Sequence, residues 1–404
     1  MKYSNAEVME YVREEDVKFI RIAFCDVFGR QKNISIMPQE LPRAFKYGIA
    51  FDGSAIAGFD GGTRSDLLLH PDAETLTLLP WRPEHGKVVR MFARISYPDG
   101  RQFECDTRSL LKQAVEDAKR AGCSFAFGAE QEFYLFGLDE KGNPTQEPYD
   151  QAGYMDVAPD DRGENVRREI CLTLEQMGIQ PESSHHEEGP GQNEIDFRYS
   201  DALAAADNAM TFQTVVKTMA RSNGLYADFS AKPLDSKPGN GFHVNISVEP
   251  SDNTERMEHM IAGILDKVPE MTLFLNPTKN SYKRFGLSKA PSYVSWSHEN
   301  RSQLIRIPAA IGEYRRAELR SPDPTANPYL VFALLIYAGL YGIENKLPLA
   351  PPTVINLFKA DQKTLAGFKR LPDTLKAAAD LAGNSEFIRQ YIPQAIIDQY
   401  SSRD

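Results

Sequence analysis

The sequence lacks the excess of basic residues that nucleic-acid-binding proteins show. Its 404 residues include 46 Lys and Arg against 56 Asp and Glu, for a net charge of −10, whereas a protein that binds the phosphate backbone carries a basic footprint. Cysteine is also scarce: Cys25, Cys105, Cys123 and Cys171 are scattered, with no CxxC pair and no metal-finger spacing. This pattern favours reduced thiols over a disulfide framework.

Long apolar runs are missing as well. The most apolar run, residues 329–341 (YLVFALLIYAGLY), is well short of the ~20 residues that cross a bilayer. It follows Asn327-Pro328, a cap residue and then a proline at the first helical position, so it predicts a core helix. The opening residues, MKYSNAEVMEYV, have no apolar signal-peptide core. We therefore expect a cytoplasmic protein.

Two common catalytic signatures are absent too. The sequence contains no Walker-type phosphate loop, and no Ser/His or Cys/His arrangement of a nucleophilic enzyme stands out. It also has no internal repeat and no low-complexity segment. Its 42% hydrophobic and 25% charged residues are ordinary for a globular protein, and its length suggests two or three domains.

What is present first is a β-rich N-terminal region. Hairpin patterns occupy residues 17–36 and 75–97, and the glycine-rich residues 51–62 predict a loop. Pro98-Asp99-Gly100 is a strong turn signal. We place a domain boundary there, between residues 1–100 and 101–404.

The remainder mixes helices and strands without a strict βαβ rhythm. Apolar periodicity and capping residues predict helices over about 106–122, 162–177, 201–222 and 254–267. Strand patterns lie at 128–136, 193–199, 242–248 and 316–321. This order indicates an α+β fold with a mainly antiparallel sheet and flanking helices, rather than a doubly wound sheet.

The strand GAEQEFYLF (128–136) carries two carboxylates in an otherwise apolar segment. Because residues i and i+2 share a face of a strand, Glu130 and Glu132 point the same way. Two buried, ionised and unpaired carboxylates would each cost several kcal/mol. Exposure to solvent, pairing with Arg or Lys, or a bound cation would each relieve that cost.

Three other segments favour the cation. HHEEGPGQNEIDF (185–197) holds Glu187 and Glu194 around a turn, GNGFHVNIS (239–247) holds His243, and RRAELRSPDP (315–324) holds Glu318 between two arginines. Each segment alone has a plainer reading: a solvated loop, a hydrogen-bonded core histidine and a salt-bridge ladder. Together, many carboxylates with one histidine and no cysteine are the donor set of Mg²⁺ or Mn²⁺.

These segments, together with others, make the sequence resemble glutamine synthetase of the bacterial type I class over nearly its whole length. The matching stretches occur in the family's order: FDGSAIAGF, GAEQEFYLF, HHEEGPGQNEIDF, GNGFHVNIS, NPTKNSYKRF, RSQLIRIP and YRRAELRSPDPTANPYL. The resemblance implies a small β-grasp-like N-terminal domain and a large catalytic domain. It also implies homo-oligomeric rings in which each active site lies between two subunits.

The resemblance implies a role for individual residues. Glu132, Glu187 and Glu194 would hold one metal ion, and Glu130, His243 and Glu318 a second. The residues implied around glutamate and the transferring phosphoryl group are Gly239, Arg284, Arg301 and Arg320. Those implied at the nucleotide are Glu182, Ser247, Arg306 and Arg316. Asp52 matches the aspartate that binds and deprotonates ammonium.

The implied reaction joins glutamate to ammonia at the expense of ATP, with two or more Mg²⁺ or Mn²⁺ ions and an acyl-phosphate intermediate. A γ-glutamyl ligase that uses another amine, such as a polyamine or ethanolamine, is an alternative. A second alternative is a glutamine-synthetase-like protein with a regulatory or structural role and little turnover.

Three positions depart from the family pattern. Lys289 stands where a flap glutamate closes the ammonium site, and the flap (284–291) is one residue shorter; a cation there repels ammonium. Asn245 replaces a second histidine, and Pro238 replaces an asparagine that contacts the amino acid. The chain also ends at IIDQYSSRD, about where the type I enzymes continue into a helical tail that joins two rings, so a single ring is expected more than a double ring.

Overall fold

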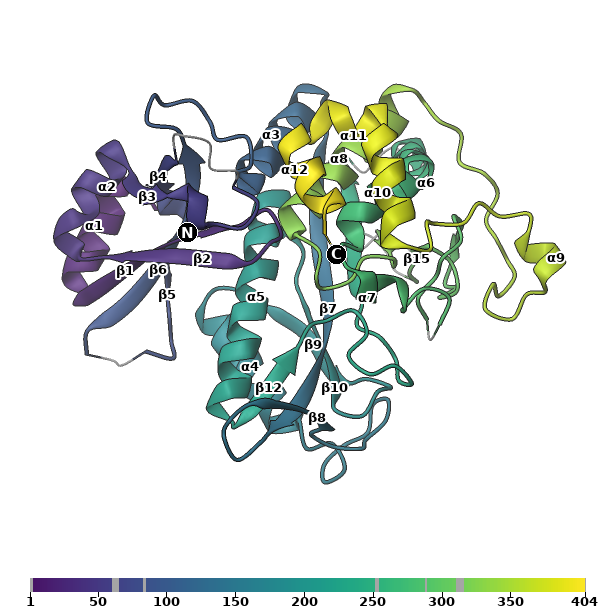
Figure 1. Cartoon of the computed structure of the whole chain (residues 1–404), viewed down its shortest axis with the longest axis horizontal. Coiled ribbons are helices and arrows are strands. Elements are labelled where there is room, and N and C mark those ends of the chain that lie inside the picture. The colour runs from purple at the N-terminus through teal and green to yellow at the C-terminus, as the bar shows by residue number, and fades with distance from the viewer. Residues whose placement is uncertain are drawn as a thin grey trace.

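The computed structural model describes residues 3–59, 65–82, 85–250, 254–287, 289–309 and 316–403 (Figure 1). Within those ranges, none of the helices combines the length and the apolar character needed to cross a membrane.

The N-terminal region forms a six-stranded sheet in the order β2-β1-β6-β4-β3, with β5 paired to β6. Its strands are β1 (Val17–Cys25), β2 (Gln31–Ile36), β3 (Ile49–Asp52), β4 (Asp66–Pro71), β5 (Thr77–Leu78) and β6 (Lys87–Ser96). Both predicted hairpins are confirmed, since β1 pairs antiparallel with β2 and β5 antiparallel with β6. Two helices accompany this sheet: α1 (Asn5–Glu14) and α2 (Leu41–Tyr47).

The predicted loop at 51–62 begins later than expected. Phe51 and Asp52 belong to β3, because they pair with Leu67 and Asp66 of β4. A short 3₁₀ turn over Gly53–Ala55 follows, and residues 60–62 lie outside the described part of the chain. Pairing across the sheet therefore extends the strand into a segment whose glycines predicted a loop.

The catalytic region is built on a ten-stranded sheet in the order β14-β15-β16-β13-β7-β10-β9, to which β8, β11 and β12 add by pairing with β7. Its strands are β7 (Ser124–Leu138), β8 (Pro144–Pro148), β9 (Pro181–His186), β10 (Gln192–Phe197), β11 (Ser200–Asp201), β12 (Leu225–Asp228), β13 (Phe242–Glu249), β14 (Trp296–His298), β15 (Ile305–Ile307) and β16 (Ala317–Leu319). All the pairings except β14 with β15 are antiparallel. The predicted α+β class is confirmed.

The helices of this region are α3 (Thr107–Arg120), α4 (Glu164–Gln176), α5 (Ala202–Ser222), α6 (Thr254–Leu275), α7 (Lys279–Tyr282), α8 (Pro328–Glu344), α9 (Gln362–Leu365), α10 (Leu375–Asn384), α11 (Glu386–Tyr391) and α12 (Gln394–Ser401). Of these, α3, α4, α5 and α6 pack against strands of the sheet, whereas α9 projects away from it on a long loop (Figure 1). The run that predicted a core helix is α8, and its Phe332 ring stacks on Phe127 of β7 at 4.4 Å between centroids. Gln131, on the same face of β7, donates to the carbonyl of Ala209 in α5.

This packing gives the two faces of β7 different surroundings. Odd-numbered residues of the strand face the helices, so Glu130 and Glu132 face the other side of the sheet. The acids therefore project from the face opposite the helical core.

The end of one predicted helix was wrong. The pattern predicted a helix over about 254–267, but α6 continues through Pro269 to Leu275. The last turns hold the buried residues Met271, Leu273 and Phe274. Burial of these side chains outweighs the hydrogen bond that the proline removes.

The boundary near residue 100 stays a prediction. Residues 97–100 do form a turn, since Gly100 has φ +87° and its N–H donates to the Tyr97 carbonyl. The two regions also contact each other directly: Arg90 donates to the Thr211 hydroxyl at 2.7 Å, and Asn327 donates to the Val27 carbonyl at 3.0 Å.

Candidate active site

Three neighbouring strands bring acidic side chains onto one sheet face. Glu132 lies opposite Glu194 of β10, and Glu130 lies between Asp196 of β10 and His243 of β13. Directly opposed residues of antiparallel strands project to the same face. Backbone pairing thus collects the acids that the sequence spreads over more than sixty positions.

One group of potential ligands is Glu130, His243 and Glu318. The Nδ1 atom of His243 lies 3.4 Å from Glu130 Oε2 and 3.7 Å from Glu318 Oε1. The ligand atoms of all three residues lie within 4.8 Å of one another. The structure therefore brings together the three residues that the resemblance implied for one metal ion.

The other implied set, Glu132, Glu187 and Glu194, is divided between two groups that share Glu194. Glu132 and Glu194 group with His243, whereas Glu187 and Glu194 group with His185, each within 4.8 Å. His185 Nε2 lies 3.2 Å from Glu187 Oε1 and 4.0 Å from Glu194 Oε1.

Sequence reasoning missed two residues of the cluster, His185 and Asp196. Asp196 joins Glu130 and Glu194 in a further group. A signal for it was present, because Asp196 is two residues after Glu194 on a strand and so shares its face. His185 could have been found as the residue two positions before Glu187.

The pKa values of the carboxyl groups in the cluster show that burial and mutual repulsion disfavour their negative charges. Burial, and then the neighbouring Glu187 carboxylate, raise the pKa of Glu132 to about 7. Burial and the acids Asp196, Glu132 and Glu130 raise the pKa of Glu194 well above its usual range. Burial alone would raise the pKa of Glu187, but hydrogen bonds from His185 and from the backbone N–H of Glu188 lower it.

The donor set fits divalent metal ions. Burial and the Arg320 guanidinium hold the pKa of His243 well below its usual range, so its imidazole is neutral and free to act as a ligand. Several buried carboxylates with one or two imidazoles are hard donors that suit Mg²⁺ or Mn²⁺. A cation among them would also remove the repulsion that raises the carboxyl pKa values.

The implied arginines differ in how they are held. Arg320 and Arg306 both donate to the Glu318 carboxylate, and Arg284 is buried with Nη1 2.8 Å from the Ser321 carbonyl oxygen. The Nε of Arg320 is buried without a hydrogen-bond partner among the described residues. Arg301 is exposed in a turn, and no hydrogen bond or ion pair to the cluster is seen for it within the described ranges.

Gly239 lies against Arg284 and the cluster. A Cβ at this position would come within 2.5 Å of the Ala231 carbonyl oxygen and 3.0 Å of Arg284 Cγ. Its own carbonyl accepts from Gln192 Nε2 at 3.2 Å, and the same amide donates to Glu132 at 3.1 Å. Only glycine therefore fits here, beside a carboxylate of the cluster.

A separate cavity of about 270 Å³ adjoins the acids. Glu130 lines it together with three of the four residues implied at the nucleotide, namely Glu182, Ser247 and Arg316. The fourth, Arg306, contacts Glu318 instead. Phe197 and Tyr199 add aromatic rings to the lining, which sequence reasoning had not singled out.

Asn245 links this cavity to the cluster. Its Nδ2 donates to Glu130 at 2.7 Å, and its Oδ1 accepts from Arg316 Nε at 2.8 Å. The residue that departs from the family's histidine thus bridges an acid and an arginine without carrying charge.

Asp52 lies away from the cluster. It ends β3 in the N-terminal sheet (Figure 1), is exposed, and accepts hydrogen bonds from the backbone N–H and hydroxyl of Ser54. Within one chain, the described residues do not bring Asp52 to the acids of β7 and β10.

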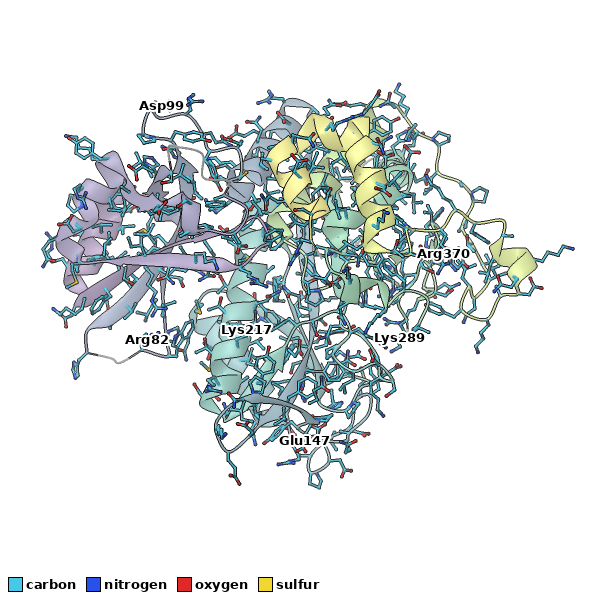
Figure 2. All side chains as sticks on the ribbon, viewed as in Figure 1. Arg82, Asp99, Glu147, Lys217, Lys289 and Arg370 are labelled. Atoms are coloured by element: carbon cyan, nitrogen blue, oxygen red, sulfur yellow. The ribbon has the colours of Figure 1, made fainter. Side chains whose placement is uncertain are left out.

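Lys289 is paired rather than free. Its ammonium lies 2.8 Å from Glu188 Oε1 and 4.7 Å from the centroid of the Tyr154 ring. Although burial opposes it, the pairing with Glu188 raises the pKa of Lys289. Figure 2 labels Lys289, which joins the flap to the turn that carries Glu187.

The comparisons with known proteins agree with this architecture. Residues 16–98 match the model of the glutamine synthetase β-grasp domain, and residues 104–403 match that of the glutamine synthetase catalytic domain. The chain belongs to the glutamine synthetase family, and it is an enzyme of the glutamate–ammonia ligase type, a class that uses ATP and divalent metal ions.

Individual relatives cover nearly all of the chain. A glutamine synthetase of Methanosarcina mazei is 44% identical over an alignment of 409 residues that covers 98% of this chain and 92% of that protein. A glutamine synthetase of Clostridium saccharobutylicum is 42% identical over an alignment of 414 residues that covers 99% of this chain and 94% of that protein. A solved GmaS/ADP complex superposes with a TM-score of 0.87 at 28% identity, and the match covers 97% of this chain and 93% of that one.

Proposed function

We propose that this chain makes glutamine from glutamate, ammonia and ATP on the acidic face of β7, β10 and β13. The observation that carries the proposal is the convergence of Glu130, Glu132, Glu194 and His243 on one face beside the cavity lined by Glu182, Ser247 and Arg316. A cluster of metal ligands beside a cavity with an arginine is what phosphoryl transfer from a nucleotide requires.

Glu130, His243 and Glu318 are assigned to one Mg²⁺ or Mn²⁺ ion, and Glu132, Glu187 and Glu194 to a second. When bound, the two ions neutralise the charge that spreads over the transferring phosphoryl oxygens. In this assignment Glu194 belongs to the second set, where its carboxylate is near Glu132 on one side and Glu187 on the other. His185 orients the Glu187 carboxylate through its 3.2 Å contact.

The arginines would orient the two reactants. Glu182, Ser247, Arg306 and Arg316 are assigned to the nucleotide, in keeping with the GmaS relative solved with ADP. Arg284, Arg301 and Arg320 would face glutamate and the transferring phosphoryl group, with Gly239 leaving room for the amino acid. Glutamate's γ-carboxylate oxygen attacks the γ-phosphorus of ATP, the bond to ADP breaks, and an acyl phosphate forms.

Ammonia then attacks the activated carbonyl carbon, and phosphate leaves with the C–O bond electrons. Asp52 is assigned to bind ammonium and take its proton. Because Asp52 is remote from the acids of its own chain, this step needs the Asp52 of a neighbouring copy. We therefore propose a homo-oligomeric ring with each site between two subunits. Residues 1–100 of one subunit and residues 101–404 of its neighbour would form each site.

A second amine remains a candidate because of Lys289. The ammonium of Lys289 is neutralised by Glu188, so the flap does not present a free cation to ammonium, but it also lacks the usual acid. A larger amine, such as ethanolamine or a polyamine, could bind in the same site through contacts other than a flap carboxylate.

Phosphate release separates the candidates. The protein is supplied with ATP, glutamate and Mg²⁺ or Mn²⁺, and ammonium, ethanolamine and a polyamine are added in turn. Release with ammonium comparable to that with the best amine supports glutamine formation. Release only with another amine overturns it in favour of the second candidate, and release without glutamate would overturn both.

A further inference from the structure

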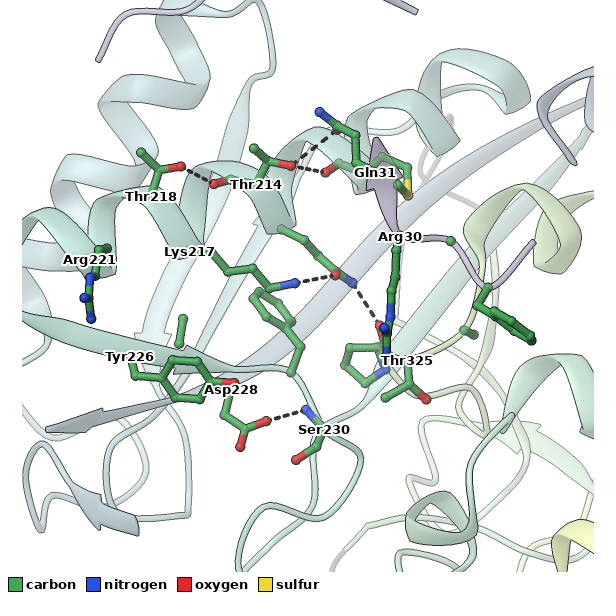
Figure 3. Close-up of a pocket in the computed structure, with 18 of the residues that line it drawn as sticks. Arg30, Gln31, Thr214, Lys217, Thr218, Arg221, Tyr226, Asp228, Ser230 and Thr325 are labelled. Atoms are coloured by element: carbon green, nitrogen blue, oxygen red, sulfur yellow. Dashed lines mark hydrogen bonds between the residues drawn. The ribbon is translucent and has the colours of Figure 1, made fainter. Parts of the chain in front are cut away.

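A large cleft lies outside the site above, between the N-terminal sheet and the catalytic region. It has a volume of about 960 Å³, which suits a small-molecule ligand. One wall comes from the hairpin of β1 and β2 and from the loop after β5. The other comes from α5 and β12, and Figure 3 shows Lys217 and Tyr226 of this wall with Arg30 of the hairpin.

The cleft is strongly basic although the whole chain carries a net charge of −10. Six cationic side chains line it: Arg21, Arg30, Arg82, Lys217, Arg221 and Arg403. Figure 2 labels Arg82 on the N-terminal side and Lys217 on α5. One carboxylate, Asp228, also lines the cleft, and it accepts from the backbone N–H of Ser230 at 2.7 Å.

Three of the six cations have neutral hydrogen-bond partners. Lys217 Nζ lies 3.4 Å from Gln213 Oε1, Arg221 donates to the Gly142 carbonyl, and Arg403 donates to the Pro277 carbonyl. Within the described ranges none of the six forms an ion pair with a carboxylate. Asp228 attracts Lys217, and Asp26 and Asp323 attract Arg403, only from a longer distance, so the protein compensates their charge in part.

The cations also repel one another. Desolvation of the Lys217 ammonium in the cleft, and then the nearby Arg30 guanidinium, lower the pKa of Lys217. Burial, together with Arg30, also lowers the pKa of Arg403, although Tyr400 opposes this, and burial with Arg82 lowers that of Arg21. An anion between them would replace repulsion with attraction.

The rest of the lining suits an organic molecule. Thr214 and Thr218 present hydroxyl groups from successive turns of α5, and the rings of Trp81, Tyr226 and Phe229 add apolar surface. Side chains of this kind hold a carbon skeleton while the cations hold its charged ends.

We propose that this cleft binds a small organic anion with at least two negative charges, either a dicarboxylate or a phosphorylated metabolite. Arg30 and Arg82 hold it from the N-terminal side, and Lys217 and Arg221 hold it from α5. The anion thereby ties the N-terminal sheet to the catalytic region. This site is separate from the acidic face of β7, whose ligands are negatively charged.

Calorimetry with two probes tests the site and distinguishes the two sources. Succinate and inorganic phosphate are titrated separately into metal-free protein at an ionic strength held constant with chloride. We expect saturable binding of at least one, weakened about tenfold or more in the double variant Arg30→Gln/Lys217→Met because two cations are lost. The control Lys376→Met removes an exposed lysine of α10 and should bind as the wild type does.

A second measurement needs no variant. Phenylglyoxal modifies accessible arginines, and mass spectrometry locates them. The bound probe should slow modification of Arg30 and Arg82 but not of the exposed Arg13. Binding that the double variant retains, no binding of either probe, or equal protection of Arg13 would each overturn the proposal.

Discussion

At the scale of single residues, the acids of β7 explain both the fold and the chemistry. Glu130 and Glu132 are tolerated in a central strand because the face they occupy is not packed against the helices. The resemblance implied Glu130, His243 and Glu318 as ligands of one metal ion, and the structure brings their ligand atoms within 4.8 Å of one another. The resemblance could not identify the pairing of Lys289 with Glu188, because these residues are a hundred positions apart and meet only in the folded chain.

Glu132→Gln tests the metal assignment without relying on activity. The glutamine keeps an oxygen that can accept from the backbone N–H of Gly241, which lies 2.8 Å from Glu132 Oε2, and it removes one negative charge from a crowded cluster. We expect the metal-free variant to be as stable as the wild type or more stable. Binding to the native state raises the melting temperature. The shift that Mn²⁺ causes should therefore be smaller in the variant than in the wild type, because one of the two proposed metal sites loses a ligand. A full Mn²⁺ shift in Glu132→Gln, measured by differential scanning calorimetry, would refute the assignment.

Glu188→Gln tests how Lys289 affects the amine. Loss of the carboxylate leaves the Lys289 ammonium uncompensated, and a cation at the flap repels ammonium. We expect the KM for ammonium to rise about threefold or more at low ionic strength, with a smaller change in kcat. The double variant Glu188→Gln/Lys289→Met should restore the KM. An unchanged KM in Glu188→Gln would place Lys289 too far from the amine to matter.

At the scale of elements, the turn between β9 and β10 positions Glu187 through a buried network. His186 Nε2 lies 2.9 Å from Asp150 Oδ1, and its Nδ1 donates to the Glu187 carbonyl at 2.7 Å. The backbone N–H of Gly191 also donates to Asp150. Asp150, which the sequence analysis did not single out, therefore holds both ends of the turn.

Asp150→Asn should destabilise this turn in a pH-dependent way. Burial opposes the charged imidazole, but the hydrogen bond to Asp150 raises the pKa of His186 above 6.5. The stability from this pair is fully present below pH 6.5 and is lost as pH rises through the raised pKa. We expect the variant to lose about 3 kcal/mol at pH 5.5 and less at pH 9, as measured by urea unfolding at both values. A loss that grows with pH would contradict this account.

The elements themselves were largely predictable. The periodicity of α3, α4 and α5 and the hairpins of the N-terminal sheet follow from local pattern. The end of α6 was not predictable in this way, because burial of residues after Pro269 depends on which surfaces they meet. For the same reason, the sharing of Glu194 between two ligand groups follows from strand register, which local pattern does not give.

At the scale of the whole molecule, the proposed site needs residues from two chains. The acids lie in the catalytic sheet, whereas Asp52 lies exposed in the N-terminal sheet. A ring of identical subunits with heterologous contacts repeats one such junction around its circumference. The basic cleft between the two regions lies where a bound anion would fix their relative position.

Complementation tests the shared site. Asp52→Ala and Glu132→Ala should each be inactive as pure proteins, because each loses one half of every site. Co-expressed subunits that assemble at random should regain about a quarter of the wild-type activity, since one junction in four joins an intact Asp52 to an intact Glu132. Mixtures that stay inactive, although native mass spectrometry shows mixed oligomers, would mean that each site takes both residues from one chain, and an active Asp52→Ala would place Asp52 outside the catalytic site.

Oxygen transfer tests whether the acidic face makes an acyl phosphate. Glutamate labelled with ¹⁸O in its γ-carboxylate is incubated with ATP, ammonium and Mg²⁺, and the released phosphate is analysed by mass spectrometry. The carboxylate oxygen bridges to phosphorus and leaves with it, so each phosphate formed together with glutamine should carry one ¹⁸O. The variant Glu132→Gln should form no labelled phosphate. Phosphate that carries only unlabelled oxygen would contradict the proposed reaction.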